Sequence, residues 1–62
     1  MLWLSEVLLQ HHDIETFADL ENIISEKARQ GEIFFRMDVK PPYGDTPENW
    51  EDRLETAFNV RR

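Results

Sequence analysis

The 62-residue sequence predicts a small, mostly helical α+β domain with two or three helices and one clear β-strand. Apolar residues recur at helical spacing in two separate segments, residues 17–28 and residues 50–58. Between these segments, residues 32–39 alternate with the period of a strand, in the order Glu-Ile-Phe-Phe-Arg-Met-Asp-Val. Internal repeats and linker-like tracts are absent, so residues 1–62 are predicted to form a single domain.

Residues 1–10 permit two interpretations. Ser5 can begin a short helix that ends near Gln10, and Leu4, Val7 and Leu8 then share one face. The first four residues can equally extend as a strand. The absence of strict alternation favours the helix.

The clearest helix is predicted to span about four turns and to end at Gly31. Asp13 or Thr16 is its expected N-cap, because Thr16 is followed three residues later by an acid, Asp19. Acids near its start and bases in its last turn also suit the helix dipole. Its core-facing residues are predicted to be Phe17, Leu20, Ile23, Ile24 and Ala28.

The strand predicted at residues 32–39 needs a partner, because a single strand cannot satisfy its own backbone hydrogen bonds. Either residues near the N-terminus or the same segment of a second copy can supply it. Ile33, Phe35, Met37 and Val39 are predicted to face the core, which places Phe34 on the polar face. An aromatic residue there is better explained by contact with a partner chain or with the last helix than by exposure to water.

After a stiff turn at Pro41-Pro42, Thr46-Pro47 is predicted to start the last helix. The apolar stripe of this helix contains Trp50, Leu54, Ala57 and Phe58. Four acids, Glu48, Glu51, Asp52 and Glu55, are predicted to occupy its opposite surface.

The chain carries 13 acidic and 7 basic residues, a net charge of -6, and this balance disfavours binding to nucleic acid. It has no cysteine, and no apolar run reaches the length of a membrane span, so a cytoplasmic protein without a membrane segment is expected. A domain of this size has a thin core. Neither a disulfide nor a structural metal site is predicted to stabilise it. Because oligomerisation is the other common way to stabilise a small fold, we expect a homodimer.

No catalytic, cofactor or metal site is predicted. His11, His12 and Asp13 carry good ligand groups, but sequence neighbours seldom converge on one ion, so a polar connection between two elements is the favoured interpretation. The acids of the last helix suit a solvated surface better than a pair of catalytic carboxylates.

We therefore expect a non-enzymatic protein–protein interaction or regulatory module that binds another protein of unknown identity. Its size also suits an accessory protein of a phage or mobile element that acts on a host factor. One alternative is an acidic nucleic-acid mimic that inhibits a DNA- or RNA-binding enzyme, and a second is a small helix-turn-helix-like DNA-binding regulator. The candidate partner-binding residues are Trp3, Phe34, Tyr43, Glu48, Glu51, Asp52 and Glu55.

Overall fold

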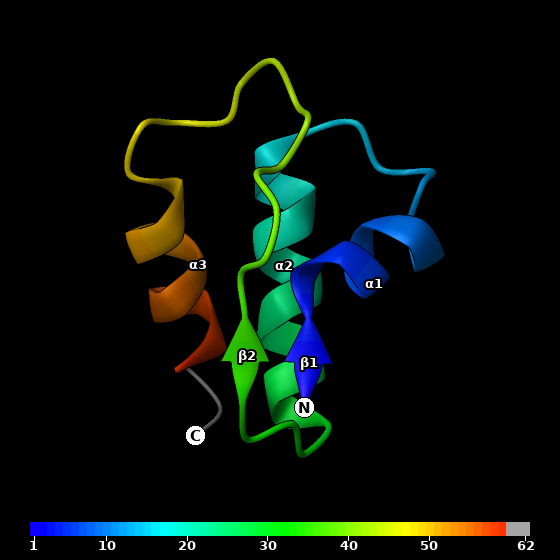
Figure 1. Cartoon of the computed structure of the whole chain (residues 1–62), viewed down its shortest axis with the longest axis vertical. Coiled ribbons are helices and arrows are strands. Elements are labelled where there is room, and N and C mark those ends of the chain that lie inside the picture. Colours follow the sequence, from blue (N-terminus) through cyan, green and yellow to red (C-terminus); the bar gives the residue numbers. More distant parts are fainter. Residues whose placement is uncertain (60–62) are drawn as a thin grey trace.

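The computed structural model describes residues 1–59 and confirms a small, mostly helical α+β fold. The elements follow in the order β1 (Leu2–Trp3), α1 (Leu4–Gln10), α2 (Phe17–Arg29), β2 (Phe35–Arg36) and α3 (Trp50–Phe58) (Figure 1). In this described part of the chain, every helix is too short or too polar to cross a membrane.

The strand partner comes from the same chain. β1 and β2 pair in parallel, with Leu2 opposite Phe35 and Trp3 opposite Arg36, and the Leu2 N–H donates to the Phe34 carbonyl at 2.7 Å. Parallel strands need a long crossover connection, and α1 and α2 form it here (Figure 1).

The paired part of β2 is much shorter than the predicted strand 32–39. The chain leaves β1 and enters α1 at Leu4, so β2 has no neighbouring strand beyond Trp3. Phe35 and Met37 pack against the core as predicted, whereas Ile33 and Val39 are exposed.

Residues 1–10 combine both interpretations that the sequence left open, a short strand and then a helix. Leu4 and Val7 of α1 are buried and Leu8 packs against them, which confirms the predicted face. The N-cap position of α1, Trp3, supplies no side-chain hydrogen bond. Instead, the Asp38 carboxylate, which follows β2, accepts from the Ser5 N–H at 3.1 Å.

Helix α2 has the ends that its sequence predicts. The Thr16 hydroxyl accepts from the Asp19 N–H at 3.2 Å. At the other end Gly31 adopts φ +110°, and the N–H groups of Gly31 and Glu32 bond to the carbonyls of Ala28 and Lys27. These two bonds form a Schellman motif, which requires the left-handed backbone that glycine tolerates.

Helix α3 begins at Trp50, later than the predicted start at Thr46-Pro47. The Thr46 hydroxyl donates to the Pro41 carbonyl at 3.5 Å, and the Thr46 N–H bonds to the Tyr43 carbonyl. Because both groups serve the preceding loop, Thr46 does not cap the helix. The neighbouring Asp45 carboxylate accepts instead from the Phe17 N–H, with oxygen–nitrogen distances of 3.0 and 3.2 Å.

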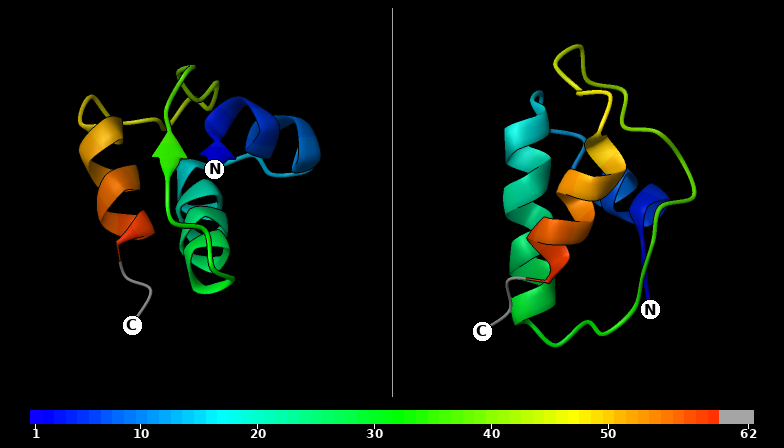
Figure 2. Two further views of the ribbon diagram at one scale, coloured as in Figure 1. Left: turned by 60° about the horizontal axis from the view of Figure 1, so that its bottom comes forward. Right: turned by 90° about the vertical axis from the view of Figure 1, so that its left-hand side faces the viewer.

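The core lies between the small sheet and a pair of helices, α2 and α3, that run side by side in the same direction (Figures 1 and 2). The Ser25 hydroxyl of α2 donates to the Ala57 carbonyl of α3 at 3.0 Å. The Phe35 ring lies 5.3 Å from the Phe58 ring and so joins β2 to α3. The buried apolar residues are Leu2, Leu4, Val7, Phe17, Leu20, Ile24, Ala28, Leu54, Ala57 and Phe58.

Candidate partner-binding face

The two-stranded sheet has one covered face and one open face. Leu2 and Phe35 lie opposite each other and pack toward α2 and α3. Because side chains alternate along a strand, their sequence neighbours are directed to the other side of the sheet. We call this side the outer face and define it by Met1, Trp3, Phe34 and Arg36.

The outer face exposes large apolar side chains. Phe34 is 64% exposed, Met1 61% and Trp3 37%, whereas Leu2 on the covered face is only 7% exposed. Helices α2 and α3 both lie on the covered side of the sheet (Figure 2). The last helix therefore does not cover Phe34, although the sequence left that explanation open, and α3 contacts Phe35 instead.

Arg36 lies within this apolar surface. Its guanidinium carbon is 5.9 Å from the centre of the Trp3 ring, which is within the range of a cation–π contact. A hollow of about 300 Å³ opens beside this pair, and Met37 and Asp38 complete its lining. The outer face thus combines apolar side chains, a cation and a depression.

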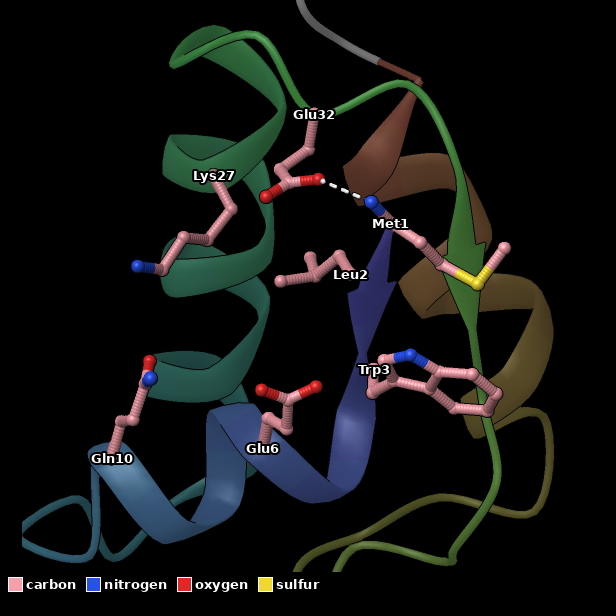
Figure 3. Close-up of a pocket in the computed structure, with 7 residues that line it drawn as sticks. All are labelled: Met1, Leu2, Trp3, Glu6, Gln10, Lys27 and Glu32. Atoms are coloured by element: carbon pink, nitrogen blue, oxygen red, sulfur yellow. Dashed lines mark ion pairs between the residues drawn. The ribbon is translucent and has the colours of Figure 1, made fainter.

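The flank of β1 next to α2 is more polar. Figure 3 shows Leu2 directed toward α2, while the Met1 and Trp3 side chains extend toward β2. The Met1 amino group lies 3.5 Å from a Glu32 carboxylate oxygen. A second hollow of about 180 Å³ on this flank is lined by Met1, Leu2, Trp3, Glu6, Gln10, Lys27 and Glu32.

Tyr43, another candidate partner-binding residue, is not part of the outer face. It lies in the loop between β2 and α3, where it is half-buried and packs against the core. Burial, followed by the negative charges of Asp13 and Asp19, raises the pKa of its phenol above the ordinary value. The half-burial and the two acids near the start of α2 favour a packing role for Tyr43.

The four acidic candidates lie on α3 and in the turn before it. Glu48, Glu51, Asp52 and Glu55 are all exposed, as the sequence predicts for the solvated side of an amphipathic helix. Arg53, on the same helix, reaches the Glu21 carboxylate of α2 at 2.8 and 3.1 Å. It also lies over the Phe17 ring at 5.2 Å.

His11, His12 and Asp13 lie in the connection between α1 and α2, which is where the sequence placed them. Across residues 1–59, the structure brings no three His, Asp, Glu or Cys residues together in an arrangement that could hold a metal ion.

One feature of the outer face could not be identified from the sequence. The structure places Trp3 level with Arg36, which makes one surface from two residues 33 positions apart. The alternation of residues 32–39 does predict that Arg36 shares a face with Phe34. The local sequence of either strand, however, does not predict their parallel pairing or its register.

Comparison with protein-family models, with curated proteins and with solved structures gave no match.

Proposed function

We propose that this protein is a non-enzymatic interaction module that binds another protein through its outer face, defined above by Met1, Trp3, Phe34 and Arg36. We also propose a cytoplasmic location, as the sequence leads us to expect. The observation that carries the proposal is the exposure of Phe34 and Trp3 beside Arg36 on one side of the sheet. Exposed apolar patches of this kind mark interaction sites, and Trp and Arg are enriched among the residues that dominate binding energy.

Photo-crosslinking tests this function directly. A photoreactive phenylalanine analogue replaces Phe34 in one variant and Leu9 in another, and irradiation of cells that make the protein traps any neighbour. Leu9 is a matched control, because it is also a large and exposed apolar residue, 76% exposed, but lies on α1. We expect a discrete adduct with a second protein from position 34 and none from position 9. Absence of an adduct at position 34 would contradict the proposal.

The same experiment addresses the expected homodimer. The pairing of β2 with β1 means that a second copy is not needed to complete the sheet. Packing of two outer faces is still the simplest way for the chain to self-associate, because it would cover Phe34 and Trp3 in both copies. A self-adduct at position 34, together with a solution mass that rises with concentration in light scattering, would identify a second copy as the occupant.

A second candidate function is nucleic-acid mimicry by the acidic row Glu48, Glu51, Asp52 and Glu55. The observation that favours it is that all four side chains are exposed along one helix and its preceding turn. A crosslinker at position 55 would then trap a basic enzyme, and the combined change Glu51→Lys and Asp52→Lys would abolish the adduct. Binding through this row should also weaken steeply as salt is added.

A further inference from the structure

We propose that the outer face binds an extended peptide segment in which an apolar side chain and an Asp or Glu side chain are two residues apart. This inference rests on the proposed function and specifies the chemistry of the partner. In the bound segment, the carboxylate pairs with Arg36 and the apolar side chain covers Phe34 and Met1.

The charge argument comes from Arg36. Two other arginines already have carboxylate partners, since Arg53 pairs with Glu21 and Arg29 lies 3.8 Å from Glu26. Within residues 1–59, no carboxylate lies within ion-pair distance of Arg36. The nearby Asp38 carboxylate accepts a hydrogen bond from the Ser5 N–H instead. Arg36 is also exposed, so its guanidinium has donors available for an external acceptor.

The Trp3 ring adds preorganisation. The guanidinium lies 5.9 Å from the ring centre, so a cation–π attraction favours the position of Arg36 beside Trp3 before a ligand arrives. A planar guanidinium can pair with a carboxylate through two parallel hydrogen bonds. A phosphate group can form the same two hydrogen bonds. Asp38 lines the same hollow and would repel a doubly charged phosphate more strongly than a singly charged carboxylate, which favours the carboxylate.

The strand register defines the spacing. Trp3 lies opposite Arg36, so Met1 and Phe34, each two positions earlier in the chain, form the next level of the outer face. Residues two apart in a strand are separated by about 6.6 Å along its length. An extended ligand has the same repeat, so its side chains at positions i and i+2 can meet the apolar level and the Arg36 level together.

A random linear peptide library displayed on phage tests this proposal, with the folded chain as bait. We expect enriched peptides to carry an apolar residue and an acid at i and i+2 spacing. A synthetic peptide with amidated ends, made from the enriched sequence, then enters a double-mutant cycle. Glu→Gln or Asp→Asn in the peptide should weaken binding to the wild type about tenfold, which corresponds to about 1.4 kcal/mol, but should not affect binding to Arg36→Gln.

Arg29→Gln is the matched control, because Arg29 is an exposed arginine of α2 with only a long contact to Glu26. The control should bind the peptide as the wild type does. Enriched peptides that lack a carboxylate but lose binding with Phe34→Ser would overturn this inference and leave the proposed function intact. Failure to enrich any peptide above the Phe34→Ser bait would also overturn this inference, and the photo-adduct at position 34 would then decide the proposed function separately.

Discussion

Replacement of Asp45 by alanine should destabilise the fold through the start of α2, although Asp45 is distant from this helix in sequence. The Asp45 carboxylate accepts from the Phe17 N–H at 3.0 and 3.2 Å, and the Thr16 hydroxyl accepts from the Asp19 N–H. The first N–H groups of a helix have no partner within it. Asp45 therefore acts as a second cap and ties the loop between β2 and α3 to α2.

The magnitude follows from two contributions. Loss of a capping side chain typically costs about 1 kcal/mol. Removal of a negative charge from beside the first turn of a helix adds about 0.5 kcal/mol at an exposed site. Asp45→Ala should therefore lower the free energy of unfolding by about 1.5 kcal/mol. Asp45→Asn keeps an acceptor oxygen and should lose only the charge contribution, about 0.5 kcal/mol.

Urea unfolding followed by tryptophan fluorescence measures the effect, because the half-buried Trp50 becomes exposed when the core opens. With a slope of about 1 kcal/mol per molar urea, the midpoint should fall by about 1.5 M for Asp45→Ala. Glu48→Ala removes an exposed acid from the same loop and should stay within about 0.5 kcal/mol of the wild type. If Asp45→Ala matched Glu48→Ala, the capping role would be refuted.

Three further predictions concern one ion pair, one hydrogen bond and one glycine. The Glu21–Arg53 ion pair is partly exposed. A double-mutant cycle with Glu21→Gln and Arg53→Gln should therefore give a coupling energy of about 0.5 kcal/mol that decreases as salt is added. A coupling energy unaffected by salt would argue against an ion pair. Hydrogen bonding to Ser5 lowers the pKa of Asp38 below its ordinary value. The ionised Asp38 carboxylate therefore stabilises the folded state at a pH above the pKa that Asp38 has in the unfolded chain. This stabilisation is lost as the pH falls through the lower pKa of Asp38 in the folded state. The stability difference between wild type and Asp38→Asn, measured by urea unfolding across acid pH, should therefore narrow below about pH 4, and a constant difference would contradict this. Gly31 has φ +110° and open space around it, so an added side chain would meet no neighbouring atom. Gly31→Ala should therefore lower the free energy of unfolding by about 1 kcal/mol through backbone strain alone. An unchanged melting temperature would show that the turn does not need glycine.

Features encoded by local sequence were predicted well. The Thr16 cap, the apolar face of α2 and the turn at Gly31 all match the structure, because each depends on residues within a few positions of one another. The predicted stripe of α3 is also correct, since Leu54, Ala57 and Phe58 are buried. The start of α3 was placed too early, because the Thr46 side chain contacts Pro41 instead of capping the helix.

The candidate site was only partly predictable. Trp3 and Phe34 each break the local pattern, and both are exposed in the structure. Tyr43 breaks no local pattern, and whether it contacts the core or solvent depends on the path of its loop, which docks onto α2 through Asp45. Alternation places Arg36 on the face of Phe34, but its contact with Trp3 exists only because β1 pairs with β2 in this register.

The sequence by itself determined the fold class, the extent of α2, the core-facing stripe of α3 and the acidic character of the surface. These follow from composition and from periodicities that act within one element. The tertiary structure alone decided that β2 pairs with β1, that Asp38 and Asp45 reach the starts of α1 and α2, and that Trp3 meets Arg36. Each of these contacts joins residues about 30 positions apart, and such long-range contacts leave no periodic pattern in either partner segment.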